Sequence, residues 1–163
     1  MSLFRRRPEQ PDEDDLQVER LLLASEGRAI PPAAIELAAR VGQRGRGQVH
    51  VFCVVRVWGT GLGLPNPGLM PTKHEWDAQR AVVGDAVKAL EERGVKATGH
   101  VLATRKATKR ILGEAERLGC SAIVMAADAP RNRILADLMW SQEPYRVRRR
   151  AQVPVYLVVK PLG

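Results

Sequence analysis

The chain has 163 residues, of which 45% are hydrophobic and only 4% aromatic, and its formal net charge is +8. This length suits one compact domain, and no apolar run approaches the roughly 18 residues that cross a bilayer. The two cysteines, Cys53 and Cys120, are too few for a disulfide framework, and neither has the spacing of a metal ligand. We therefore expect a cytoplasmic protein that does not span a membrane.

The positive charge is concentrated in two segments, residues 105–110 and 146–150. A basic domain invites comparison with proteins that bind nucleic acid or anionic membranes. Charge runs on helices are usually solvated faces, however, and we interpret both segments in this way. Nucleic acid is therefore not expected as a partner.

Residues 1–17 combine dense charge with few apolar side chains, a composition typical of disordered segments. They contain an Arg triplet but no apolar run after it, so no secretory signal is expected. We predict a disordered charged arm over residues 1–17 and one domain over residues 18–163.

The first half of this domain contains two predicted strands and a helix. The apolar run at 18–25 is typical of a strand buried on both faces. A helix begins at Pro31 and Pro32 and ends among the glycines at 42–47. A second strand is predicted at 48–58, which is dense in β-branched residues. The Gly/Pro-rich segment 59–72 lacks the glycine spacing of a dinucleotide site and is predicted to be a surface loop.

The second half continues this alternation of strands and helices. In chain order the pattern predicts a helix with Trp76, Val83, Val87 and Leu90 on one stripe, a strand at 95–104, a helix at 107–118, a strand at 121–127, a helical region over 133–150 broken near 141–144, and a strand at 153–159. Strands that alternate with helices predict a single Rossmann-like, doubly wound α/β domain, with five mostly parallel strands and helices on both faces.

Four segments in this order resemble the universal stress protein family of the adenine nucleotide α-hydrolase-like superfamily. They are LLLASEG with the Ala-rich helix after it, VHVFCVV, ATKRILGEAERLGCSAIVMAA and AQVPVYLVVK. The resemblance covers about residues 18–160 and implies the same α/β fold.

The resemblance also implies where an adenine nucleotide would bind. In nucleotide-binding members the fourth strand ends in a Gly-x-x-Gly turn, and Gly-Ser or Gly-Thr follows about nine residues later, so that bare backbone N–H groups and a helix N-terminus hold the phosphates. Here Ala126 and Ala129 stand at the two glycines. The later pair corresponds to Trp140-Ser141 or Ser141-Gln142, so only Ser141 is kept.

At the other end of the implied site, Glu26 takes the position of an Asp that follows the first strand in the family. Val54 matches an adenine-contacting position but is equally a core valine, which we favour, and Ala24 completes the set. Methyl groups in the turn block close approach of a phosphate, and Asp128 places a negative charge beside it. We predict an inherited but degraded site with no stably bound cofactor. ATP binding is the alternative.

Other catalytic chemistry has little support in the sequence. His50, His74 and His100 have no Cys, Asp or Glu at metal-ligand spacing, so we expect structural histidines and no metal. Neither cysteine has the signature of an activated nucleophile, and no nucleophile-elbow or phosphate-loop motif occurs. We do not expect an enzyme.

Three function classes remain open. The favoured one is a universal stress-type regulatory protein that acts mainly through protein–protein contacts. The others are an adenine-nucleotide-binding stress sensor, and a basic adaptor subunit that docks on a larger acidic, nucleic-acid or membrane complex. The resemblance further implies a homodimer through the strand at 153–159, whose two faces are both largely apolar.

Overall fold

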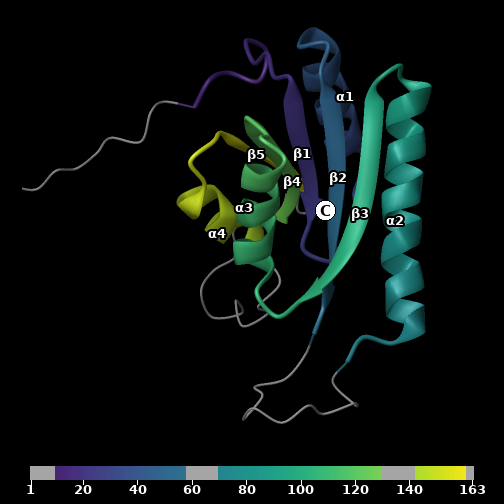
Figure 1. Cartoon of the computed structure of the whole chain (residues 1–163). Helices are drawn as coiled ribbons and strands as arrows, with labels where there is room; N and C mark the ends of the chain where they lie inside the picture. Colours follow the sequence, from purple (N-terminus) through teal and green to yellow (C-terminus); the bar gives the residue numbers. More distant parts are fainter. Residues whose placement is uncertain (1–9, 58–69, 130–141, 161–163) are drawn as a thin grey trace, which may run out of the picture.

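The computed structural model describes residues 10–57, 70–129 and 142–160. In this part of the chain one five-stranded sheet has the order β3-β2-β1-β4-β5, and every neighbouring pair is parallel (Figure 1). The elements in chain order are β1 (Arg20–Ser25), α1 (Pro32–Arg44), β2 (Gln48–Arg56), α2 (Lys73–Glu92), β3 (Lys96–Thr104), α3 (Ala107–Arg117), β4 (Ala122–Asp128), α4 (Glu143–Arg150) and β5 (Val155–Lys160). The predicted doubly wound α/β fold is confirmed.

The central strand β1 shows why the fold has two helical layers. Successive side chains of a strand point to opposite faces. Leu21 and Leu23 are fully buried in a core cluster with α1 and α2, while Leu22 and Ala24 are buried in a second cluster with α3 and α4. A strand covered on both faces must be apolar throughout, which explains the unbroken hydrophobic run in the sequence.

Two glycines near the end of α1 have different roles. The helix continues through Gly42 to Arg44, so it ends within the predicted range of 42–47. Gly42 is small because a Cβ there would lie 3.1 Å from the side chains of both Val49 and Val95. Gly45 follows the helix, and a Cβ on it would lie 2.1 Å from the carbonyl oxygen of Val18.

The last residues of the predicted arm contact the domain. Leu16 is 7% exposed and belongs to the core cluster under α1 and α2, because an apolar side chain is stabilised by burial there. The Tyr156 hydroxyl donates to the Pro11 carbonyl at 2.6 Å, and Arg44 pairs with Asp14 at 3.0 Å. Residues 1–9 lie outside the described residues, so the boundary at residue 18 stays a prediction.

Two other predicted segments lie partly outside the described residues. Of the surface loop predicted at 59–72, the structure describes residues 70–72. Of the helical region predicted over 133–150, it describes residues 142–150, which include α4. Within the described ranges, none of the helices is long and apolar enough to cross a membrane.

The contrast between two glycines gives a test of the packing. We expect Gly45→Ala to lower the free energy of unfolding by about 1–3 kcal/mol, because the new methyl group meets the Val18 backbone. Gly84→Ala in α2 is the control, since a Cβ there meets nothing within 4 Å, and it should raise the free energy by about 0.5–1 kcal/mol. Urea unfolding of both variants measures the difference. Equal effects would contradict the packing.

Candidate functional site

The carboxyl ends of the parallel strands meet at one edge of the sheet. From β1 the chain moves outward to β2 and β3, and then crosses to β4 on the other side of β1. Ligands of open α/β sheets bind at the edge where the strand order reverses in this way. The candidate site is therefore formed by the residues that follow β1, by the ends of β2 and β4, and by the start of α4.

A tight turn after β1 points Glu26 into this edge. The Ser25 hydroxyl accepts from the Gly27 amide at 3.2 Å and donates to the Arg28 carbonyl at 2.5 Å. Gly27 has a φ of +125°, which favours glycine, and its carbonyl accepts from the Gln79 side chain at 2.9 Å. The turn is thereby tied to α2, and Glu26 is 0% exposed.

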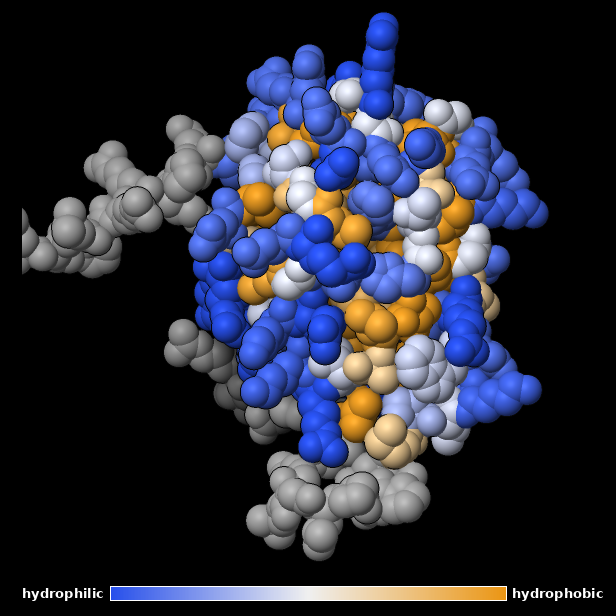
Figure 2. All heavy atoms as spheres, viewed as in Figure 1, coloured by the Kyte–Doolittle hydropathy of each residue, from blue (hydrophilic) through white to orange (hydrophobic). Residues whose placement is uncertain are grey.

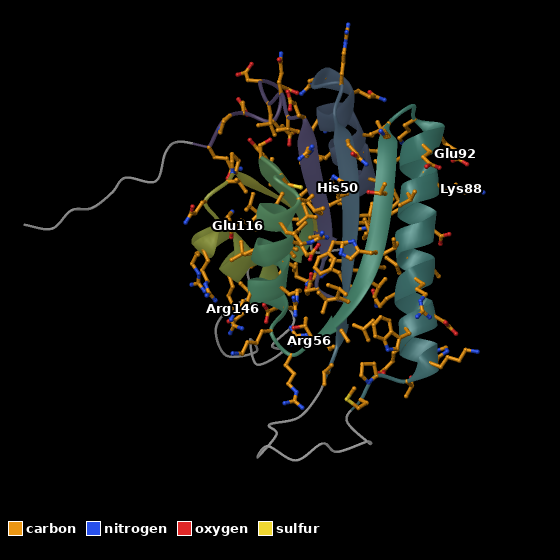
Figure 3. All side chains as sticks on the ribbon, in the orientation of Figure 1. His50, Arg56, Lys88, Glu92, Glu116 and Arg146 are labelled. Carbon is orange, nitrogen blue, oxygen red and sulfur yellow. The ribbon has the colours of Figure 1, made fainter. Side chains whose placement is uncertain are left out.

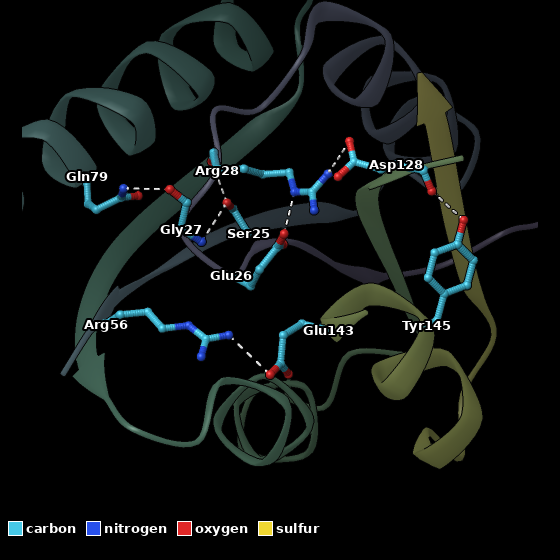
Figure 4. Close-up of polar contacts among 9 residues, drawn as sticks. All are labelled: Ser25, Glu26, Gly27, Arg28, Arg56, Gln79, Asp128, Glu143 and Tyr145. Carbon is cyan, nitrogen blue, oxygen red and sulfur yellow. Dashed lines mark hydrogen bonds and ion pairs between the residues drawn. The ribbon is translucent and has the colours of Figure 1, made fainter. Parts of the chain in front are cut away.

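Arg28 lies between two carboxylates (Figure 4). Its Nε donates to Glu26 Oε1, and its Nη1 lies 3.3 Å from Asp128 Oδ1 at the end of β4. Burial raises the pKa of Glu26 above its ordinary value, the Arg28 charge opposes this shift, and the Glu143 charge adds to it. Glu26 Oε2 is buried and has no hydrogen-bond partner among the described residues.

A second ion-pair cluster forms around Glu143, the first residue of α4. Arg56 at the end of β2 donates to Glu143 Oε1 at 3.1 Å, and both side chains are only 8% exposed. Thr108 of α3 donates to Glu143 Oε2, and Arg146 contacts Oε1 at 3.3 Å. Arg56 and Arg146 lie toward the same end of the sheet (Figure 3). This one carboxylate therefore joins β2, α3 and α4.

The two clusters are neighbours across the edge. The Tyr145 hydroxyl of α4 donates to the Asp128 carbonyl at 2.5 Å, which ties the start of α4 to the end of β4. The edge thus holds two ion-pair clusters, Arg28 with Glu26 and Asp128, and Glu143 with Arg56 and Arg146.

The structure distributes the predicted nucleotide residues over different environments. Ala24 and Val54 are buried in the core cluster with α3 and α4, in keeping with the core interpretation of Val54. Ala126 lies inside β4 opposite Val158, and Ala129 follows that strand. Of the set, Glu26 brings a charged side chain to the edge. Ser141 lies outside the described residues, as does Trp140.

The charged partners at the edge are absent from the sequence-based set. Arg28, Arg56 and Glu143 are separated by long stretches of chain, and Arg56 and Glu143 lie 87 residues apart. The sequence could have indicated these residues only by their positions. Each is charged and lies just after a strand, at a strand end, or in the first turn of a helix. Such positions meet at one edge of a parallel sheet, but pairing among them depends on the tertiary structure.

Two of the three histidines, His50 and His100, contact neighbouring polar side chains. His50 lies 2.9 Å from the Thr98 hydroxyl, and His100 Nε2 lies 2.9 Å from Glu114 Oε2. Burial and nearby positive charges, first among them Arg20, lower the pKa of His50. Across the described residues, no three His, Cys, Asp or Glu side chains are grouped so that they could hold a metal ion.

Comparison with known proteins gives a consistent result. The model of the universal stress protein family matches residues 17–159. Similar solved structures include a universal stress protein family member from Burkholderia pseudomallei, with 20% identity, a TM-score of 0.63, and coverage of 86% of this chain and 95% of that one. A universal stress protein from Archaeoglobus fulgidus has 16% identity, a TM-score of 0.65, and coverage of 86% and 93%.

The Archaeoglobus fulgidus protein is also similar in a structure solved in complex with dAMP, with 17% identity, a TM-score of 0.62, and coverage of 85% of this chain and 95% of that one. No curated protein matches the chain. At these identities the solved structures show a shared fold.

The raised pKa of Glu26 predicts a pH dependence of stability. The folded state binds this proton more tightly than the unfolded state, so the contribution of Glu26 to stability falls as pH rises above the ordinary value of 4.5. Compared with wild type, the Glu26→Gln variant should therefore gain relative stability between pH 4 and pH 7. Urea unfolding at each pH measures this difference, with Glu116→Gln as the control for loss of an exposed carboxylate. A difference that is constant or falls with pH would contradict the prediction.

Proposed function

Because the chain belongs to the universal stress protein family, we propose that it is a stress-type regulatory protein that acts through protein–protein contacts and holds no stably bound nucleotide. The supporting observation is that the charged side chains at the carboxyl ends of the strands pair with one another. Glu26, Asp128 and Glu143 place three carboxylates where phosphate groups would approach, and the neighbouring guanidinium groups are engaged by them.

The energies favour this proposal. A triphosphate that recruited Arg56 or Arg28 would separate it from a buried carboxylate, and breaking a buried pair costs about 3–5 kcal/mol. Binding with a Kd of 1 mM corresponds to about −4.1 kcal/mol, which is of the same size. The new phosphate contacts would thus be largely offset by the lost internal pairs.

A nucleotide sensor is the second candidate, and one cavity favours it. Val54 lines a cavity of about 240 Å³ at the end of β2, together with Arg56 and residues from the start of α2. The buried Gln79 Oε1 on the same wall has no hydrogen-bond partner among the described residues. A small ring with a hydrogen-bond donor would satisfy it, and the Archaeoglobus fulgidus relative was solved with dAMP.

Calorimetry with Mg-ATP separates the two candidates. Wild-type protein should bind with a Kd of about 1 mM or weaker, because the edge is self-paired. Asp128→Asn removes one half-exposed carboxylate and should tighten binding by no more than about fivefold, the range of a surface charge pair. A micromolar Kd for wild type, or adenine nucleotide that co-purifies in stoichiometric amount, would favour the sensor. Loss of that binding in an Ala78→Trp variant, which would fill the cavity from α2, would then assign it to the cavity.

The proposal includes no catalytic step, and the thiols support this. Burial raises the pKa of Cys53 to about 12 and that of Cys120 to about 11, so neither thiol forms a nucleophilic thiolate near neutral pH. Cys53 belongs to the core cluster under α1 and α2, and Cys120 to the cluster under α3 and α4. Two free thiols on opposite faces of the sheet suit a reducing compartment, and we propose the cytoplasm.

A homodimer through β5 is part of the proposal. β5 is an edge strand, so one row of its backbone groups has no neighbouring strand within the described sheet. Val159 is 44% exposed on this strand, while Leu157 is partly buried against the core cluster beneath α3 and α4. Pairing of two copies about a two-fold axis would cover Val159 and complete the backbone hydrogen bonds.

Light scattering at tens of micromolar tests the dimer. Wild type should have the mass of a dimer, and Val159→Lys should have the mass of a monomer because the charge would be buried at the interface. Met70→Lys is the matched control, since Met70 is 57% exposed and lies before α2, away from β5. A monomeric wild type, or a dimeric Val159→Lys, would contradict the interface.

A further inference from the structure

Two basic segments that are distant in the sequence lie side by side in the fold. α3 packs against α4, and the two helices cover the same face of the sheet (Figure 1). Residues 105–117 and 143–150 together hold nine Arg or Lys residues and three Glu residues. Hydrophilic side chains gather over these helices in the space-filling view (Figure 2). We call these two segments the basic surface.

Most cations on the basic surface have no internal partner. The side chains of six residues make no hydrogen bond, ion pair or ring contact within the described part of the chain: Arg105, Lys106, Lys109, Arg110, Arg149 and Arg150. Elsewhere Arg44 pairs with Asp14 and Arg93 pairs with Glu36. The described cations that lack such a contact outside the basic surface are spread over separate segments: Arg46, Lys73, Lys88 and Lys96. The largest group of unpaired charges therefore lies on one face.

The acidic residues of the same helices do little to neutralise these charges. Glu114 is 4% exposed and contacts Arg117 and His100, which lowers its pKa. Glu143 is engaged by the buried cluster at the sheet edge. Only Glu116 of the three is exposed. The surface consequently attracts anions.

The cations line two hollows on either side of the start of α3. One, of about 710 Å³, lies between α3 and the end of β3, and the other, of about 660 Å³, lies between α3 and α4. Arg105, Lys106 and Lys109 line both hollows, so the cationic lining continues around the first turns of the helix. A helix about 10–12 Å wide with a cationic hollow on each side matches two phosphate strands that flank a groove.

We propose that the basic surface binds double-stranded DNA through its phosphates, with α3 lying along the major groove. The B-form major groove is about 12 Å wide and admits a helix, whereas the major groove of duplex RNA is too deep and narrow for side chains to enter. Neither hollow is lined by an aromatic residue, so single strands gain no base stacking. Binding is accordingly independent of sequence and strongly dependent on salt.

Other anionic partners fit the basic surface less well. The large hydrophobic side chains that are exposed in the described chain are Met70 and Val159, and neither lies on α3 or α4. A protein interface needs an apolar centre, and a flat bilayer would reach only the tips of the cations and leave the hollows empty. A DNA duplex uses both the charge and the hollows.

Fluorescence anisotropy with a random-sequence 20-base-pair DNA tests the proposal. Wild type should bind at 50 mM salt, and the logarithm of its affinity should fall with the logarithm of salt with a slope of about −4, as for four to five phosphate contacts. Lys109→Gln with Arg150→Gln should weaken binding about tenfold or more and reduce the slope by about 2. Arg105→Gln with Arg110→Gln is a second variant that should act in the same way.

The control is Lys88→Gln with Lys96→Gln, which removes the same charge from α2 and from the start of β3. Lys88 lies on the opposite side of the view from Glu116 and Arg146 of the basic surface (Figure 3). The control should leave both affinity and slope near the wild-type values. The proposal is overturned if the control weakens binding as much as the two variants do, or if wild type does not bind at 50 mM salt. It is also overturned if duplex RNA, or vesicles with 30% phosphatidylserine, bind more tightly than DNA. The DNA-binding measurement does not depend on ATP binding. Failure of this proposal can therefore be distinguished from failure of the proposed function.

Discussion

Five parallel strands end at the same edge of one sheet, and this geometry brings the residues after β1 and those at the ends of β2 and β4 into one small region. Charged groups in such a space must be paired, because an isolated buried charge is costly. In this chain the pairs are internal: Arg28 contacts Glu26 and Asp128, and Arg56 contacts Glu143. The edge is therefore held together by the same kind of contact that a bound phosphate would otherwise make.

This pairing has consequences for α4. The helix has only eight residues, and three of its last four are arginines, so it gains little stability on its own. Its position depends on Val147 in the core and on Glu143, which accepts from Arg56 and Thr108. A ligand that displaced Arg56 from Glu143 would loosen the start of α4. The internal ion pairs thus link the packing of this helix to the weak nucleotide binding that we propose.

Much of the fold could be predicted because its determinants are local. Continuous apolar runs mark strands buried on both faces, and prolines and glycines mark the start of α1 and the end of α2. The site could be located only in part. Glu26 was recognisable from its place after β1, but its pairing with Arg28 depends on the turn at Gly27, and the Arg56–Glu143 pair joins residues 87 positions apart. The end of α1 among the glycines could be predicted, but the close approach of Val49 and Val95 to Gly42 could not, because the sequence does not place these residues near one another.

The excess of exposed positive charge follows from the same arrangement. Glu143 and Glu114 lie on helices that carry many cations, and in isolated helices they would partly neutralise their neighbours. In the fold both are buried, Glu143 against Arg56 and Glu114 against His100, and each pairs with only one arginine of its own helix. A carboxylate that pairs with a buried side chain no longer neutralises the exposed cations of its own helix. Burial of these carboxylates therefore leaves an excess of positive charge on the exposed side of α3 and α4. Because the two helices pack together, the two charge runs, which look like separate solvated helix faces in the sequence, form one surface.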